Sequence, residues 1–175
     1  MNRNIEIKAR MKDFRRTQEI AESLADGESQ VLNQEDIFFL CKSGRLKLRV
    51  FSDEQGELIC YERPDTIGPK QSRYMISQTC EPHTLREVLS SALEILGTVR
   101  KTRLLYMIGQ TRVHLDTVEG LGAFIELEVV LQPQQTEQDG QAIADRLAEL
   151  LQIQEDDLVP CAYVDLIRNA AAAEG

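Results

Sequence analysis

The stretch "TRVHLDTVEGLGAFIELEVV", residues 111–130, decides the fold class because it carries two alternating runs around a Gly-rich turn. In the first run polar side chains alternate with Val113 and Leu115, and in the second Glu126 and Glu128 alternate with apolar neighbours. Strict alternation over about four to eight residues indicates a strand with one apolar and one polar face. The segment therefore predicts a hairpin whose polar face brings carboxylates close together.

Alternation of the same kind recurs along the chain at short intervals. It predicts eight strands, at residues 4–10, 36–41, 45–51, 57–63, 71–79, 98–107, 111–117 and 123–131. Turn-forming residues separate several of them, as in "KSG" at 42–44 and "SDEQG" at 52–56, so most neighbours are expected to pair antiparallel. Because helical segments interrupt the strands, the expected fold class is α+β.

Helical spacing of apolar residues predicts helices at residues 13–25, 84–96 and 139–152. In the second, Thr84 is followed by Glu87, which is the pattern of a capping box. Pro160 then breaks the chain before a short final segment, and the tail "NAAAAEG" is expected to fray. We therefore expect one domain over residues 1–170 and a flexible C-terminal tail over residues 171–175.

Composition limits the classes of function. With 29 acidic and 20 basic side chains the net charge is −9, which argues against a protein that coats nucleic acid by bulk charge. Apolar runs fall far short of the roughly 20 residues of a transmembrane helix, and the start lacks the apolar core of a signal peptide. The four cysteines lie far apart with no Cys-x-x-Cys pair, so a zinc site is not expected. These features predict a cytoplasmic protein that binds neither membrane nor nucleic acid.

Charged residues gather on one face of the predicted strands, since side chains alternate sides along a strand. That face holds nine basic and four acidic groups, a balance of +5, whereas the rest of the chain carries −14. The basic groups are Lys8, Arg10, Arg45, Lys47, Arg49, Arg63, Lys101, Arg103 and Arg112. The acidic groups are Glu6, Asp116, Glu126 and Glu128.

Two architectures suit such a face. In a half-solvated antiparallel sheet the face would point into water, but a solvated face usually mixes Thr, Ser and Gln with both charge signs. A closed or nearly closed barrel explains the segregation better, with helices over the apolar outside and charged groups lining a wet tunnel. Repulsion among the basic groups of that tunnel would be relieved by a polyanion.

The charged face indicates chemistry on phosphates. Arg and Lys from several strands match the oxygen array of a di- or triphosphate, and the carboxylates offer hard oxygen ligands for Mg²⁺ or Mn²⁺. Together they favour phosphoryl or nucleotidyl transfer. No Gly-rich loop ending in Gly-Lys-Ser/Thr occurs, and "GLG" at 120–122 is expected to be a plain turn. His114 suits either a proton carrier or a structural hydrogen-bonding group.

Several motifs follow one another along almost the whole chain: "NIEIK", then "QEDIFFLCKSGRLKLRVF", "ELICYERPD", "GPKQSRY", "VRKTRLLY", "VHLDTVEGLGAFIELEV" and "AYVDLI". In that order and spacing they resemble the CYTH superfamily of triphosphate tunnel metalloenzymes, whose N-terminal signature is Glu-x-Glu-x-Lys. The resemblance implies an eight-stranded antiparallel β-barrel that forms a triphosphate tunnel, with surrounding helices.

The resemblance also implies roles for individual residues. The triphosphate would contact Lys8, Arg45, Lys47, Arg49, Arg63, Lys101 and Arg103. The divalent metal, Mg²⁺ or Mn²⁺, would be held by Glu6, Asp116, Glu126 and Glu128. Glu6, Lys8, Glu126 and Glu128 are the expected catalytic residues, whereas the motifs do not require Arg10, Arg73 or Arg112.

One departure from the signature is Asn4, which stands where the first Glu is expected. The change removes a charge and leaves a carbonyl oxygen as a weaker ligand. This departure affects two expected properties of the site: whether it binds a second metal ion and which ion it prefers.

The motifs look most like the class IV adenylyl cyclase branch, which implies conversion of ATP to cyclic AMP and pyrophosphate. Hydrolysis of ATP, thiamine triphosphate or tripolyphosphate is the nearest alternative. A nucleotide- or polyphosphate-binding module without catalysis, suggested by Asn4, is the third hypothesis. The cyclase-like resemblance also implies a homodimer. Tyr163 and Asp165 would either close the tunnel mouth or anchor the last segment.

Overall fold

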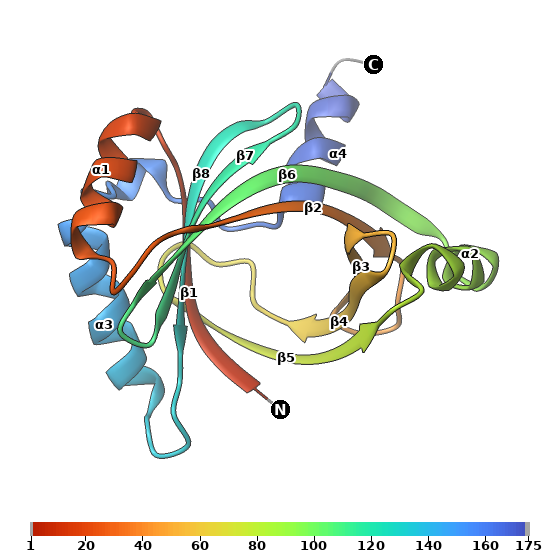
Figure 1. Cartoon of the computed structure of the whole chain (residues 1–175), viewed down its shortest axis with the longest axis horizontal. Coiled ribbons are helices and arrows are strands. Elements are labelled where there is room, and N and C mark those ends of the chain that lie inside the picture. Colours follow the sequence, from red (N-terminus) through yellow and green to blue (C-terminus); the bar gives the residue numbers. More distant parts are fainter. Residues whose placement is uncertain (1, 174–175) are drawn as a thin grey trace.

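The chain folds into a closed antiparallel β-barrel with helices on its outside (Figure 1). The structure is a computed structural model that describes residues 2–173. Within that range the barrel strands are β1 (Asn2–Arg10), β2 (Gln30–Phe39), β3 (Arg45–Ser52), β4 (Gln55–Glu62), β5 (Lys70–Thr79), β6 (Ile95–Ile108), β7 (Thr111–Val118) and β8 (Gly122–Val130). They follow the order β1-β5-β4-β3-β2-β6-β7-β8, and β8 pairs with β1 to close the ring. The predicted fold class is confirmed.

Helices cover the outside of this barrel at separate places. They are α1 (Phe14–Leu24), α2 (Pro82–Ala92), α3 (Glu137–Leu150) and α4 (Tyr163–Ala173), with a short 3-10 helix η1 (Glu155–Asp157) before α4. Figure 1 shows α1 and α3 on one flank, α2 on the opposite flank and α4 beside β6. Each helix therefore buries its apolar side against a different part of the barrel wall.

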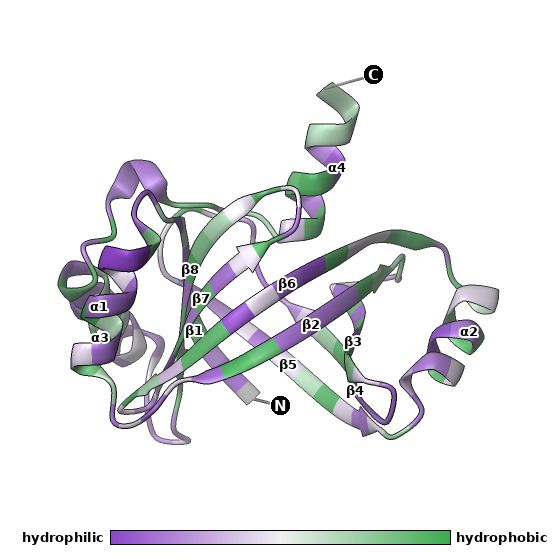
Figure 2. Ribbon diagram, turned by 45° about the horizontal axis from the view of Figure 1, so that its top comes forward, coloured by the Kyte–Doolittle hydropathy of each residue, from purple (hydrophilic) through white to green (hydrophobic). Residues whose placement is uncertain are grey.

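Alternation along the strands gives the barrel an apolar outside and a polar inside. On β1, Ile5 and Ile7 are buried in the cluster under α1 and α3, whereas Glu6 and Lys8 point into the barrel. Figure 2 shows bands of hydrophilic and hydrophobic colour along β2 and β6. The apolar core thus lies between the barrel and its helices, and the charged side chains of the strands are placed in the interior.

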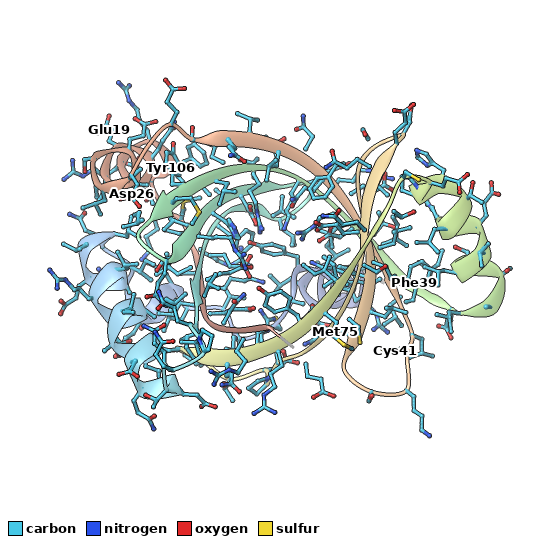
Figure 3. The ribbon with its side chains drawn as sticks, turned by 60° about the horizontal axis from the view of Figure 1, so that its bottom comes forward. Glu19, Asp26, Phe39, Cys41, Met75 and Tyr106 are labelled. Atoms are coloured by element: carbon cyan, nitrogen blue, oxygen red, sulfur yellow. The ribbon has the colours of Figure 1, made fainter. Side chains whose placement is uncertain are left out.

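Buried aromatic residues anchor the helices on the two flanks (Figure 3). Tyr106 of β6 is buried beside α1, and its hydroxyl donates to Glu22 Oε1 at 3.1 Å. On the other flank Phe39 of β2 is buried with Leu48 and packs near Leu89 of α2. Among the helices of the described range, none is long and apolar enough to cross a membrane.

Several boundaries differ from those predicted by the sequence, and the starts of β2 and α2 show why. β2 begins at Gln30, six residues before its predicted start, because pairing with β6 extends the strand through a mostly polar segment that lacks regular alternation. The predicted capping box at Thr84 and Glu87 is wrong, since α2 begins at Pro82 and its N-cap, Glu81, makes no side-chain capping bond. Proline suits the first helical position because its missing N–H would have no partner there.

A capping box does form at the start of α3. The side chain of Thr136 accepts from Asp139 N at 3.2 Å, and Asp139 Oδ2 accepts from Thr136 N at 2.8 Å. Aspartate replaces the usual Glu or Gln in this reciprocal pair. The sequence prediction missed it because it placed the helix start at Asp139.

The last segment is a helix, where the sequence predicted a short segment and a frayed end. α4 continues to Ala173 and packs on the barrel through Val164. The helix approaches β6 so closely at Gly97 that a Cβ on this residue would lie 2.9 Å from Val164 Cγ2. Glycine therefore allows the close packing. Residues 174–175 lie outside the described range, and the division into a domain over 1–170 and a flexible tail stays a prediction.

Candidate functional site

A cavity of about 310 Å³ lies inside the barrel, lined by inward-facing side chains from every strand. Its volume is within the range of small-molecule sites. The basic lining residues within the described range are Lys8, Lys47, Arg49, Arg63, Lys101, Arg103 and Arg112. The acidic ones are Glu6, Asp36, Glu57, Glu126 and Glu128, which leaves a balance of +2.

This balance is smaller than the +5 predicted, because some charges lie elsewhere. Arg45 is at the barrel rim, where its guanidinium donates to both carboxylate oxygens of Asp65, at 3.1 and 2.7 Å, and to Asp165 Oδ2 at 2.8 Å. Arg10 is exposed, with its guanidinium 4.9 Å from the ring centroid of Phe124. Neither side chain lines the cavity, so the predicted phosphate contact of Arg45 has no support from its position.

Asp36 is a buried tunnel carboxylate that the sequence analysis did not single out. Its Oδ1 accepts from Arg49 Nε at 2.8 Å, and its Oδ2 accepts from Lys47 Nζ and Arg49 Nη2, both at 2.9 Å. Burial alone would raise the pKa of Asp36, but Arg49 and Lys47 together lower it well below its ordinary value. The signal was present in the strand parity, but the predicted second strand started at this residue, so its face was not assigned.

Asp116 is fully buried behind the cavity wall and is held by three partners. Arg103 donates to both of its oxygens, at 2.6 Å each, and the Tyr163 hydroxyl donates to Oδ2 at 2.9 Å. Lys101 Nζ lies 3.4 Å from the same oxygen. Burial and the neighbouring Arg103 lower the pKa of Lys101 to about 7, although Asp116 opposes this shift. Asp116 therefore fixes the position of a tunnel arginine.

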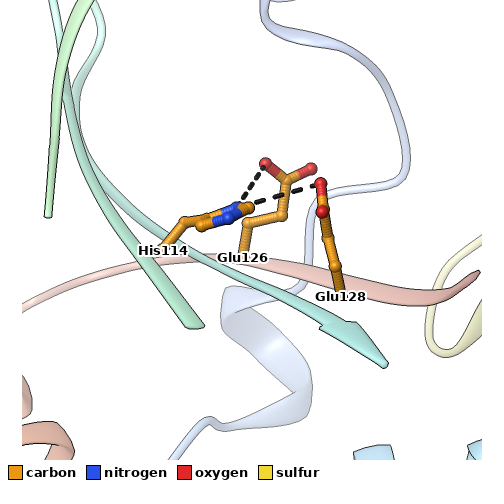
Figure 4. Close-up of side chains that lie close together, drawn as sticks. All are labelled: His114, Glu126 and Glu128. Atoms are coloured by element: carbon orange, nitrogen blue, oxygen red, sulfur yellow. Dashed lines mark ion pairs between the residues drawn. The ribbon is translucent and has the colours of Figure 1, made fainter. Parts of the chain in front are cut away.

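The acidic wall is formed by neighbouring residues of β1, β8 and β7. In the strand register Lys8 pairs with Glu126, which pairs with His114, and the adjacent row contains Glu6, Glu128 and Arg112. One ligand atom from each of His114, Glu126 and Glu128 lies within 4.8 Å of the others. Figure 4 shows the three side chains gathered together, with dashed lines for the ion pairs of His114. His114 Nδ1 is 3.9 Å from Glu126 and 3.8 Å from Glu128.

Burial and neighbouring charges set the protonation of this wall. Burial raises the pKa of Glu6, as do the neighbouring glutamates. Burial would also raise the pKa of Glu126, but Lys8 and other cations lower it well below its ordinary value. Burial lowers the pKa of His114, which favours the neutral imidazole, the form that ligates metals. Within residues 2–173, His114 Nδ1 is a buried atom with no hydrogen-bond partner.

Arg63 differs from the other tunnel arginines in having unused donors. Its side chain is 3% exposed, and Nη1 donates to Glu6 Oε2 at 3.0 Å. Within the described range its Nε and Nη2 are buried with no hydrogen-bond partner. Because buried N–H groups are nearly always paired, this guanidinium in the cavity lining indicates an anionic ligand.

The two ends of the tunnel differ, and we call them the α4 end and the open end. At the α4 end Lys70 Nζ donates to Pro160 O at 2.6 Å, and Lys8 Nζ donates to Cys161 O at 3.5 Å and lies 4.0 Å from the Tyr163 ring centroid. At the open end β1 begins and β6 ends. The cavity lining there is apolar or aromatic and partly exposed, with Leu32, Phe51, Tyr74, Ile76 and Leu105.

Tyr163 and Asp165 combine the two roles that the sequence left open. Tyr163 lines the cavity at the α4 end and binds Asp116. Asp165 accepts from Arg45, and its Oδ2 also accepts from Ala162 N at 3.1 Å, which ties the start of α4 to the rim. Lys70, which the sequence analysis did not single out, is buried at the same end.

The sequence model of the CYTH domain matches residues 2–163 of this chain. The chain belongs to the CYTH family. A comparison with curated protein sequences found no match. The CYTH fold seen here is shared with solved structures of low sequence identity, which support the fold alone.

Three of these structures illustrate the likeness. A protein from Pyrococcus horikoshii has 23% identity and a TM-score of 0.82, and the alignment covers 93% of this chain and 98% of the other. A candidate adenylate cyclase from Vibrio parahaemolyticus has 15% identity and a TM-score of 0.77, with 94% and 97% covered. A candidate adenylyl cyclase from Hippeastrum, described as having a dominant triphosphatase activity, has 16% identity and a TM-score of 0.66, with 95% and 96% covered.

In this CYTH protein Asn4 is buried beside the acidic wall. In the amide orientation that satisfies both of its polar atoms, Asn4 Nδ2 donates to Arg3 O and Oδ1 accepts from Arg112 Nη2, each at 3.1 Å. The oxygen that the sequence left as a weak metal ligand is therefore engaged by a neighbouring arginine. A neutral side chain at this position suits a wall that already holds three glutamates, Glu6, Glu126 and Glu128.

Proposed function

We propose that this CYTH protein is a divalent-metal-dependent enzyme acting on a nucleoside or organic triphosphate, and that its reaction is the conversion of ATP to cyclic AMP and pyrophosphate. The observation that carries the proposal is Arg63, whose buried guanidinium has two N–H groups without partners in a cavity of about 310 Å³. A phosphate oxygen array supplies the acceptors that these groups need.

The proposed phosphate-binding residues are six of the seven basic groups that line the tunnel: Lys8, Lys47, Arg49, Arg63, Lys101 and Arg103. They project from several strands, so a linear triphosphate can meet cations on more than one side. Arg45 keeps a different role in the proposal, because its guanidinium is used by Asp65 and Asp165 at the rim. There it holds the α4 end of the tunnel.

A divalent metal suits the cluster of His114, Glu126 and Glu128. Carboxylates with one imidazole form a donor set that Mn²⁺ accepts readily and Mg²⁺ accepts less readily. We propose Glu126 and Glu128 as ligands, joined by His114 or by Glu6 of the adjacent strand. Asp116 is proposed as a positioning group for Arg103, since both of its oxygens are already hydrogen-bonded. Bound there, the metal would polarise phosphoryl oxygens and offset developing charge.

In the proposed cyclisation the ribose 3′-hydroxyl gives its proton to water and its oxygen forms a bond to the α-phosphorus. The bond from that phosphorus to the bridging oxygen of the leaving pyrophosphate breaks. Negative charge then accumulates on the pyrophosphate. Arg63 and Lys8 lie toward the α4 end and can hold the terminal phosphates of the leaving group. Fixed cations of this kind act mainly by positioning and by electrostatic stabilisation.

Hydrolysis of a triphosphate is the second candidate. It is favoured by the many basic side chains in the tunnel lining, which suit phosphate oxygens. Few of the polar lining residues suit a base or a ribose. The triphosphatase activity ascribed to the Hippeastrum protein points in the same direction. In this reaction a water oxygen, rather than the 3′-oxygen, would attack phosphorus.

The test is a substrate panel with resolved products. Purified protein is incubated with ATP, thiamine triphosphate or tripolyphosphate in Mg²⁺ or Mn²⁺, and cyclic AMP, pyrophosphate and phosphate are measured separately. Cyclic AMP with equimolar pyrophosphate supports the cyclase, whereas phosphate without cyclic AMP replaces it by the hydrolase. Tight binding of these ligands with no product under either ion would instead support the non-catalytic module.

Three expectations stay predictions. Homodimeric assembly comes from the family resemblance, whereas the cytoplasmic location and the absence of nucleic-acid partners come from the composition of the chain. The partner proposed from the tunnel is a small-molecule triphosphate.

A further inference from the structure

Gln34 of β2 is a buried polar residue that the proposed reaction does not use. Its side chain lines the tunnel and is 5% exposed, and within residues 2–173 its Oε1 has no hydrogen-bond partner. A buried amide oxygen without a donor costs free energy, so such groups nearly always have a partner, which a ligand in the tunnel can supply. Unlike the charged lining, an amide suits a neutral group with its own hydrogen-bonding edge.

Phe51 of β3 lies across from Gln34 on the same inner face. Glu35 pairs with Val50 in the strand register, so the next inward positions are Gln34 and Phe51. Along these strands, Gln34 and Phe51 form the next inward-facing pair after Asp36 and Arg49 in the direction of the open end. The phenyl ring is only partly buried, which leaves a face for a ligand.

The wall of the barrel opens next to these two residues. The β2–β3 pairing ends at Glu35 and Val50, and beyond it a second cavity of about 540 Å³ lies against the barrel. Gln34, Phe51 and Lys101 line both this cavity and the tunnel. A ligand that fills the charged part of the tunnel can therefore extend past Lys101 to reach an amide and an aromatic ring.

We infer that Gln34 and Phe51 form a subsite for a heteroaromatic group carried by the triphosphate, such as a nucleobase. The inference rests on the proposed triphosphate function. It adds that the organic part of the substrate is bound on the side of the tunnel toward the open end. Phe51 stacks on the ring, and the Gln34 amide bonds to its polar edge. The phosphates then lie toward the α4 end, where Lys8 and Arg63 are found. A substrate without a ring, such as tripolyphosphate, leaves the subsite unused.

The experiment compares ATP with tripolyphosphate, both titrated calorimetrically in EDTA so that turnover does not interfere. Phe51→Leu keeps apolar volume but removes the aromatic face, and Gln34→Met keeps length but removes the amide. We expect Phe51→Leu to weaken ATP binding at least about fivefold. Gln34→Met should weaken it about threefold to tenfold. Tripolyphosphate affinity should stay within about twofold in both variants, because neither change removes a charge.

Val31→Ala is the matched control, since Val31 is on the same strand but 64% exposed on the outside. Unchanged ATP affinity in both tunnel variants, or equal losses for ATP and tripolyphosphate, overturns the subsite while leaving the triphosphate function in place. A wild-type protein that binds neither ligand, in EDTA or with Mn²⁺ present, overturns the proposed function and the subsite with it. Thermal unfolding of each variant verifies that the compared proteins are folded.

Discussion

The two walls of the tunnel contain the same kinds of charged side chain but pair them differently. On the wall of β2 and β3, both oxygens of Asp36 accept hydrogen bonds from Lys47 and Arg49. On the wall of β7 and β8, Glu126 and Glu128 each give one oxygen to an arginine, and no hydrogen bond within the described range uses the other, although Glu126 Oε1 lies 3.6 Å from Lys8 Nζ. A count of charges therefore overstates what is free to bind, because the wall of β2 and β3 is largely self-neutralised.

The largest effect is expected from the open carboxylates. Glu126→Gln and Glu128→Gln keep the shape of the wall but remove ligand charge, so turnover should fall by more than about 100-fold. Mn²⁺ affinity, measured by calorimetry without substrate, should fall as well, which activity alone would not show. Glu62→Gln, at an exposed position of β4, is the control. Wild-type Mn²⁺ affinity in both variants would remove the metal site from this wall.

Arg63 should follow, because its donors are the least satisfied of the basic groups. Arg63→Ala should weaken tripolyphosphate binding about 10- to 100-fold, the range for charge-assisted hydrogen bonds. The control is Arg73→Ala on β5, since Arg73 is exposed and, among the described residues, its side chain donates a hydrogen bond only to the nearby Gln71. Equal affinities for the two variants would show that the free donors of Arg63 do not bind the anion.

The self-neutralised wall should respond in the opposite way. Asp36→Asn removes the negative partner of Lys47 and Arg49, so the free energy of unfolding at pH 7 should fall by about 3 kcal/mol. Tripolyphosphate should bind more tightly, since two cations lose their internal partner. Urea unfolding and calorimetry measure the two changes, and weaker anion binding would show that Asp36 positions the cations rather than competing for them.

The difference in unfolding free energy between wild type and Asp36→Asn should also depend on pH. The pKa of Asp36 is lower in the folded protein than in the unfolded chain, because Arg49 and Lys47 outweigh the effect of burial. Ionised Asp36 therefore stabilises the fold above the unfolded pKa of about 3.9, and this gain is lost as the pH falls through the lower folded pKa. Unfolding free energies of wild type and Asp36→Asn should converge below about pH 4.

The smallest effect is expected at Tyr163, where one hydroxyl joins α4 to the buried carboxylate. Tyr163→Phe removes the hydrogen bond to Asp116 but leaves the ring beside Lys8. The free energy of unfolding should fall by about 1 kcal/mol, which lowers the midpoint of thermal unfolding by about 3 °C. Triphosphate affinity should be little changed, since Arg103 keeps both bonds to Asp116. A large loss of affinity would assign Tyr163 a direct role in binding.

Sequence patterns predicted the barrel and most of the charged residues on its inner face. Alternation places Glu6, Lys8, Lys101 and Arg103 inside because a strand has a strict two-residue period. The same period put Glu126 and Glu128 on one face, and the strand register confirms it. Parity fails at the strand ends, where the rim begins, and for that reason Arg45 was counted in the lining.

Only the tertiary structure decided which inward groups stay free to bind. Asp36 and Asp116 belong to the same chemical class as Glu126, but cross-strand neighbours occupy their oxygens. The unpaired atoms of Arg63 and His114 likewise depend on which side chains meet across the barrel. Such meetings join residues far apart in the chain, and a local pattern holds no information about them.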